Sequence, residues 1–304
     1  MNASSRLWLI PAALMLAAGI ASFVAQVFFL PGDVDAEDWR QPADYVLEHI
    51  GPADAVTVQP GWNEDAYPYL TEVGDQVIRQ HQPLIEDVHR YERVWLLSES
   101  ERLDEALELM PFEAAETRAF GGVTVVRLDA PEERIVHFDL LDRLEEAEVS
   151  RMDGDEEVRQ CDNWDAQKRA WYCGKPDKWI YVGEDLLFMG LDPHQCIWAH
   201  PPKSGRKVRL RYEDVPMGET FRVRAGLNQR AARSKRGTDV HVRVIVGEDR
   251  VAERTVPAQE NSWKPIDVDT SQIAGQQREV VVEVWSKAVY DRFFCVNGWS
   301  LDKQ

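Results

Sequence analysis

The chain has 304 residues, and its 53 acidic side chains outnumber its 35 basic ones, which gives a net charge of −18. An acidic total of this size argues against nucleic acid as a partner, because binding to phosphates requires a basic surface. The length exceeds that of one typical domain, so we expect two folded domains.

The first apolar segment, residues 7–30, contains no charged side chain. This length suffices for a helix to cross a hydrocarbon core of about 30 Å, so we expect a single transmembrane helix. The alternative is a cleaved signal peptide, whose apolar core is normally shorter, about 7 to 15 residues. Arg6 precedes the segment and Asp33 and Asp35 follow it, which predicts a cytoplasmic N-terminus of residues 1–6 and periplasmic or extracellular domains.

The charges beyond this segment are unevenly distributed. Residues 33–159 hold 33 acidic and 11 basic side chains, whereas residues 203–243 hold 12 basic and 4 acidic ones. One interpretation is that both domains have ordinary solvated faces. The other is that the oppositely charged parts dock, or that the basic part meets an anionic glycan or a lipid head group.

Residues 33–130 alternate between helix and strand patterns, which predicts a small three-layer α/β domain. Apolar stripes and β-branched runs place helices at 39–50 and 101–110 and strands at 55–58, 93–97, 114–120 and 123–128. Gly121 and Gly122 form the predicted turn between the last two strands. No glycine-rich phosphate loop follows the first strand, so nucleotide binding has no support.

Residues 196–304 form the predicted second domain, an antiparallel jelly-roll β-sandwich. Apolar and polar residues alternate with a period of two at 208–212, 221–225, 240–246 and 280–284. Short alternating strands separated by turn residues are typical of such a sandwich. Residues 131–195 are expected to connect the domains through a strand and short helix at 135–144, a polar loop at 151–160 and a disulfide loop.

The sequence contains four cysteines, and an even, sparse set in an exported chain predicts two disulfides. The first and last strands of a jelly roll commonly lie side by side, which favours a bond between Cys196 and Cys295. Cys161 and Cys173 then remain as local partners. On the chain-entropy model, the longer and shorter closed loops would stabilise the fold by about 4.7 and about 3 kcal/mol.

Three segments follow the apolar run in a familiar order: Asp-Trp-Arg-Gln-Pro-Ala-Asp-Tyr-Val at 38–46, Gly-Pro-Ala-Asp-Ala-Val at 51–56 and Arg-Val-Trp-Leu-Leu at 93–97. They resemble the extracytoplasmic C-terminal region of polytopic GT-C glycosyltransferases of the protein-mannosyltransferase type, over about residues 25–130. The loop that supplies the catalytic acid in that family has no counterpart here. The resemblance therefore implies the soluble appendage alone, with a membrane glycosyltransferase as a partner.

The second domain has a resemblance of its own. Ile-Trp-Ala-His-Pro-Pro at 197–202, Ala-Gly-Leu-Asn at 225–228 and the segment 263–269 are similar to galactose-binding-like jelly rolls, including the NPCBM type of carbohydrate-associated module. This resemblance covers about 100 residues and implies binding of a sugar.

Sugar recognition needs aromatic faces and a few fixed polar groups. Most of the 11 tryptophans are expected in the core, and a smaller set of residues is a candidate glycan-binding surface. These candidates are Trp198, His200, Arg224, Asn228, Trp285 and Asn297.

No cofactor is expected, apart from a structural calcium ion that Asp267 and Asp269 would hold. A metal site at His194, Cys196 and His200 is the rival hypothesis to the disulfides, although its spacing matches no established zinc pattern.

The motifs GxSxG and HExxH do not occur in the sequence. His81, His89 and His137 have no partner at a recognised spacing and are expected to be ordinary surface or interface residues. We therefore expect a non-catalytic, membrane-anchored extracytoplasmic protein that binds a glycan, an anionic envelope polymer or a glycosyltransferase. The alternative is a structural subunit of a cell-envelope membrane complex without a carbohydrate ligand. An enzyme of envelope polysaccharides would require a cleft that gathers histidine and carboxylates.

Overall fold

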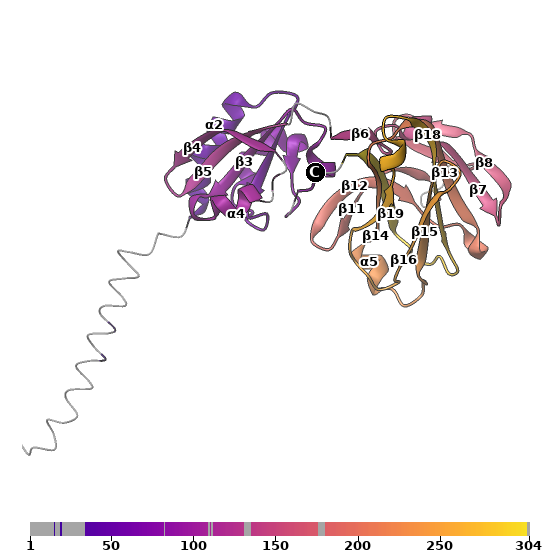
Figure 1. Ribbon diagram of the computed structural model, residues 1–304. Helices are drawn as coiled ribbons and strands as arrows, with labels where there is room; N and C mark the ends of the chain where they lie inside the picture. The colour runs from indigo at the N-terminus through magenta and orange to yellow at the C-terminus, as the bar shows by residue number, and fades with distance from the viewer. Residues whose placement is uncertain are drawn as a thin grey trace, which may run out of the picture.

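The computed structural model describes residues 34–81, 83–108, 110, 112–130, 135–175 and 180–302, together with Met15 and Gly19. The predicted membrane segment 7–30 lies outside the described residues, apart from Met15 and Gly19. Among the described helices, none combines the length and the apolar character that crossing a bilayer requires. Figure 1 shows two domains side by side, an α/β domain in indigo and purple and a β-sandwich in pink to yellow.

The first domain is built on a five-stranded sheet with the order β2-β1-β3-β5-β4. β1 pairs in parallel with β2 and β3, whereas β5 pairs antiparallel with β3 and β4. The four strands predicted for this domain are confirmed, and the two-residue β2 is an addition. The strands are Asp54–Gln59 (β1), Val77–Ile78 (β2), Arg93–Glu99 (β3), Glu113–Phe120 (β4) and Val123–Asp129 (β5).

Helices cover both faces of this sheet, as predicted for a three-layer domain. On one face, Trp39 and Val46 pack against Trp95. On the other face, Val88 and Ala106 pack against Leu96. The helices are η1 (Ala36–Trp39), α2 (Arg40–His49), η2 (Tyr67–Tyr69), η3 (Thr71–Gln76), α3 (Ile85–Val88), η4 (Ser100–Arg102) and α4 (Leu103–Glu108).

The second domain is an antiparallel jelly-roll β-sandwich, which confirms the predicted fold of this part. Its eight-stranded sheet has the order β17-β14-β19-β12-β11-β10-β9, with β6 also paired to β19, and its six-stranded sheet has the order β16-β15-β18-β13-β7-β8. Alternate valines of β15, such as Val242 and Val244, are fully buried between the sheets. Their polar neighbours point away from the core because strand side chains alternate between faces.

The bounds of these elements are β6 Val136–Asp139, η5 Leu144–Glu146, β7 Glu148–Asp153, β8 Glu156–Cys161, β9 Asn163–Asp165, β10 Ala170–Tyr172, β11 Val182–Met189, β12 Asp192–Ala199, η6 Lys203–Gly205, β13 Lys207–Pro216, β14 Thr220–Leu227, α5 Gln229–Arg233, β15 Val240–Val246, β16 Arg250–Val256, β17 Lys264–Asp269, η7 Ser271–Ile273, β18 Gln277–Ser286 and β19 Phe294–Leu301.

The sandwich begins earlier than the sequence pattern indicates. Residues 136–195, expected to be a connector, supply β6 to β11 and the start of β12, so they belong to both sheets. The predicted loop at 151–160 forms most of the β7–β8 hairpin, with Gly154 at its turn in a left-handed conformation with φ 62°. β8 exposes five of its six residues, so it has no apolar face to reveal its period.

Both predicted disulfides are confirmed. Cys161 is bonded to Cys173, and Cys196 is bonded to Cys295. The second bond joins β12 to β19, which pair antiparallel with Trp198 opposite Cys295. This excludes the rival hypothesis that Cys196 ligates a metal with His194 and His200.

Candidate functional site

The two domains contact each other through α3 and the turn that follows it. Glu86 of α3 is 3% exposed and accepts hydrogen bonds from Arg222 Nη1 at 3.1 Å and Arg224 Nε at 3.2 Å, both on β14. The acidic first domain thus docks onto basic side chains of the second, as one interpretation of the charge distribution predicted. The other basic strand residues of the region 203–243 pair with carboxylates of the sandwich; Arg209, for example, donates to Glu283.

A second set of contacts involves the start of β12. The Gln80 side chain donates a hydrogen bond to the Pro193 carbonyl at 2.8 Å, and the His81 backbone N–H donates to Asp192 at 2.8 Å. The His81 ring also contacts the Asp192 carboxylate. These contacts fix the β11–β12 hairpin against the first domain.

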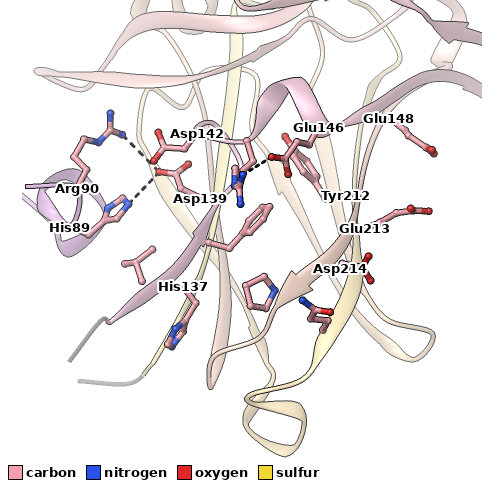
Figure 2. Close-up of a pocket in the computed structure, with 15 residues that line it drawn as sticks. His89, Arg90, His137, Asp139, Asp142, Glu146, Glu148, Tyr212, Glu213 and Asp214 are labelled. Carbon is pink, nitrogen blue, oxygen red and sulfur yellow. Dashed lines mark hydrogen bonds and ion pairs between the residues drawn. The ribbon is translucent and has the colours of Figure 1, made fainter. Parts of the chain in front are cut away.

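Between the domains lies a cavity of about 830 Å³, which we call the acidic cavity. Figure 2 shows His89 and Arg90 of the first domain facing Asp139 and Asp142 of the second. The lining residues are His89, Arg90, Val136, His137, Phe138, Asp139, Asp142, Arg143, Glu146, Glu148, Tyr212, Glu213, Asp214, Pro216 and Gln277.

Asp139, at the end of β6, is the most constrained carboxylate of the acidic cavity. It is 4% exposed and accepts hydrogen bonds from Trp299 Nε1 at 2.8 Å, Asn297 Nδ2 at 3.0 Å and the Leu141 backbone N–H at 2.8 Å. Burial raises the pKa of Asp139, the charge of Asp142 raises it further, and His89 opposes the rise.

His89 faces Asp139 from the other domain. Its Nε2 lies 3.7 Å from Asp139 Oδ2, which exceeds hydrogen-bond distance. Its Nδ1 lies 3.1 Å from the Glu86 carbonyl oxygen, which can only accept, so Nδ1 bears the proton. Burial lowers the pKa of the His89 imidazole against the opposing charge of Asp139. The neutral ring therefore presents an unprotonated Nε2 to the two aspartates.

A second cavity of about 490 Å³ adjoins the same turn, and we call it the aromatic cleft. Phe188 and Leu186 of β11 are more than half exposed beside it. Trp263 is half-buried and stacks on His194 with ring centroids 5.2 Å apart. The lining residues are Gly74, Asp75, Val77, Ile78, Arg79, Gln80, Glu86, Asp87, Arg90, Tyr91, Leu186, Phe188, Pro193, Gln195, Trp263, Asn297 and Trp299.

The six predicted glycan-binding residues do not form one surface. Asn297 lines the aromatic cleft, and Arg224 lies close by in its ion pair with Glu86. Trp198 is 2% exposed and packs in a small apolar cluster with the Cys196–Cys295 bond, so it offers no face to a sugar.

The remaining three predicted residues lie elsewhere in the sandwich. The His200 ring contacts Trp198, with ring centroids 6.0 Å apart. Asn228 caps α5, because its side chain accepts a hydrogen bond from the Ala231 backbone N–H. Trp285 stacks on His241 in the six-stranded sheet, with Lys207 and Arg243 over its ring.

The carboxylates of the predicted calcium site have protein donors. Asp267 accepts two hydrogen bonds from the Arg222 guanidinium, and Asp269 accepts from the Ser271 backbone N–H and hydroxyl. Calcium binding at this position remains a prediction, and it would require Arg222 to move.

Sequence reasoning missed the residues that the fold brings together at the domain junction. The sequence predicts His89 as an ordinary surface or interface residue, and it does lie at the domain interface, but no pattern in the sequence points to Asp139 and Asp142 as its neighbours. They are about 50 residues from His89 and belong to another domain, so no local spacing connects them.

No protein-family model matches the sequence, and no curated protein matches it. Among solved structures, the chain is similar to the CBM51 module from Clostridium perfringens GH95 in complex with methyl-galactose, with 12% identity and a TM-score of 0.25 over 39% of this chain and 77% of that one. It is also similar to CsCBM6-3 from Clostridium stercorarium in complex with cellobiose, with 8% identity and a TM-score of 0.23 over 40% of this chain and 82% of that one.

A third similar structure is CBM51-2 in complex with GlcNAc and INT domains from Clostridium perfringens ZmpB, with 14% identity and a TM-score of 0.30. That match covers 62% of this chain and 40% of the other. TM-scores below 0.5 do not by themselves establish a relationship, so the assignment of the sandwich depends on the chain's own strand order.

Proposed function

We propose that this protein binds a glycan, without catalysis, in the aromatic cleft between its two domains. The supporting observation is Phe188, a large aromatic side chain that is 57% exposed at the edge of this cleft. Trp263 and Tyr91 lie in the same lining, as do amide and guanidinium groups such as those of Gln195 and Arg79.

This combination matches the chemistry of a sugar. Aromatic rings pack against the C–H faces of a pyranose, and fixed donors and acceptors bind its hydroxyl groups. Full burial of a Phe side chain contributes about 1.5 to 3 kcal/mol. A sugar that covers Phe188 would therefore gain affinity from a ring that water now contacts. Gln80 and Gln195 lie on opposite sides of the domain junction, so one ligand would contact both domains.

The proposed setting is the extracytoplasmic face of a membrane, with the apolar segment 7–30 as the anchor. Two disulfides support this location, because such bonds persist mainly in oxidising compartments. The proposed partner, a membrane glycosyltransferase or an envelope complex, rests on the sequence resemblance of residues 25–130 to glycosyltransferase appendages. Thiol labelling in intact cells tests the location, and four reduced cysteines that face the cytosol would contradict it.

Glycan binding can be tested with the full-length chain in a detergent that has no sugar head group. A glycan array identifies a ligand, and calorimetry then compares the wild type with Phe188→Ala. We expect binding at least tenfold weaker, which corresponds to about 1.4 kcal/mol. Tyr290→Ala is the matched control, because Tyr290 is also 57% exposed and is not among the residues that line the cleft.

Three results would count against the proposal. The array could show no ligand, or Phe188→Ala could bind the ligand as tightly as the wild type and Tyr290→Ala do. Alternatively, all binding could disappear at moderate salt, which would indicate unspecific charge attraction. The first of these results would favour the alternative of a structural subunit, with the exposed apolar side chains of the β11–β12 hairpin as a protein contact.

A further inference from the structure

We infer that His89, Asp139 and Asp142 form a binding site for a divalent metal ion that links the two domains. One ring nitrogen of His89 and one carboxylate oxygen from each aspartate lie within 4.8 Å of one another. His89 belongs to the α/β domain, whereas Asp139 is the last residue of β6 of the sandwich and Asp142 follows that strand. The site is in the acidic cavity and is separate from the proposed contact of Phe188 with a glycan.

The histidine is arranged as a metal ligand. A histidine that binds a metal commonly donates its other ring N–H to a carbonyl or carboxylate, which fixes the ring and its tautomer. His89 Nδ1 makes this contact with the Glu86 carbonyl at 3.1 Å. Its Nε2 lies 3.7 Å from Asp139 Oδ2 without a hydrogen bond to it, so the space between these two atoms suits an ion that bonds to both.

The first aspartate is held in place by surrounding donors. Trp299, Asn297 and the Leu141 backbone N–H all donate to the Asp139 carboxylate. Such contacts orient a ligand before the ion arrives and are a regular part of protein metal sites. A buried carboxylate with this support is too enclosed to reach a large substrate, but a metal ion is small enough to reach it.

The second aspartate supplies the freedom that binding requires. Ligands of a tetrahedral ion with bonds of about 2.1 Å are about 3.4 Å apart, so the widest of the separations, which lie within 4.8 Å, must shrink by up to about 1.4 Å. Asp142 is exposed, and its side chain can move toward the other two. The cavity of about 830 Å³ leaves room for water as a fourth ligand.

The positive charge of Arg90 opposes the binding of a cation at Asp139. Its Nη2 lies 3.8 Å from Asp139 Oδ2, and its Nη1 donates to Gln195 Oε1 at 3.3 Å. The second contact gives the guanidinium another partner when the ion takes the Asp139 oxygen. Arg90 therefore competes with the metal, and its removal should strengthen binding.

The donor set selects the kind of ion. An imidazole with two carboxylates suits zinc, whereas calcium and magnesium prefer oxygen ligands alone. All four cysteines are in disulfides, so thiolates do not compete for zinc. We therefore expect one zinc ion, whose ligands from both domains would restrict movement at the junction.

The test is a calorimetric titration of the full-length chain with zinc chloride alone, after removal of any histidine tag. We expect one equivalent to bind, at least tenfold more weakly in Asp142→Asn and in His89→Ala, because each lacks one ligand. Arg90→Gln should bind more tightly than the wild type. His137→Ala is the matched control, since His137 lines the same cavity but pairs with Asp302, and it should bind as the wild type does.

Asp142 is exposed, so its variant should fold, which circular dichroism can verify. The inference would be overturned if the wild type showed no saturable binding, or if Asp142→Asn and His89→Ala bound zinc like the wild type. Equal affinity for calcium would overturn the assignment of the imidazole as a ligand. Weaker binding in Arg90→Gln would contradict the predicted competition.

Discussion

Acidification should destabilise the sandwich through a single buried histidine, His194 on β12. This residue is 6% exposed, and burial lowers the pKa of its imidazole from 6.5 to about 4, with a further lowering by Arg224 that Asp192 opposes. Between these two values the unfolded chain binds a proton that the folded chain does not. At about 1.4 kcal/mol per pH unit, the difference corresponds to about 3 kcal/mol of unfolding free energy.

The direction of this change in stability with pH follows from proton linkage. The contribution of His194 is fully present above pH 6.5, and it is lost as the pH falls toward about 4. Other groups titrate over the same range, so the quantity to measure is the difference between the wild type and His194→Phe. Phenylalanine preserves the stack on Trp263, removes the titrating nitrogen and replaces an Nδ1 that is buried without a hydrogen-bond partner among the described residues.

Urea unfolding of both proteins at pH 7 and pH 4.5, followed by tryptophan fluorescence, provides the assay. At pH 7 the variant should be as stable as the wild type or slightly more stable, and at pH 4.5 it should be more stable by up to about 3 kcal/mol. Equal losses of stability in the two proteins on acidification would refute the reasoning.

Three further predictions concern the ion pairs and disulfides. Glu283→Ala removes a buried carboxylate from the partly buried Lys207 and Arg209 and should lower the free energy of unfolding by about 1 to 3 kcal/mol in urea denaturation. Glu86→Gln removes the charge at the domain junction, so small-angle scattering should report a larger radius of gyration while circular dichroism stays unchanged. Cys295→Ser should lower stability by about 2 to 5 kcal/mol and more than Cys161→Ser, since its loop spans 99 residues against 12.

Much of the fold was accessible from the sequence because apolar periodicity reports burial. The alternating valines of β15 and β18 face a core on one side, and the continuous run in β3 lies between two helical layers. The disulfide partners followed from an expected adjacency of the first and last strands; β12 is not the first strand of the sandwich, but it does pair with β19. Apolar periodicity did not predict β8, because most residues of this strand are exposed and none of its faces is apolar.

The candidate sites were less accessible, because they depend on how two domains meet. A tryptophan in an alternating strand can pack in a core or face solvent. The local sequence pattern does not distinguish these cases, so it could not show that Trp198 is buried whereas Phe188 is exposed. His89 and Asp139 meet only after both domains have folded and docked. Each looks ordinary in its own segment, and only Glu86 could have been anticipated in part, from the opposite charges of the two regions.

The position of β19 has a consequence for biogenesis. This C-terminal strand is interior to its sheet, with β14 on one side and β12 and β6 on the other. β6 (Val136–Asp139) is made long before its neighbour β19 (Phe294–Leu301), so the nascent sandwich must wait, with unsatisfied strand edges, until β19 has been synthesised. Pairings that join such distant segments form slowly, and exposed edges invite aggregation. Removal of β19 (Phe294–Leu301) should therefore prevent assembly of the entire sheet, while the α/β domain, which is made earlier, would still fold.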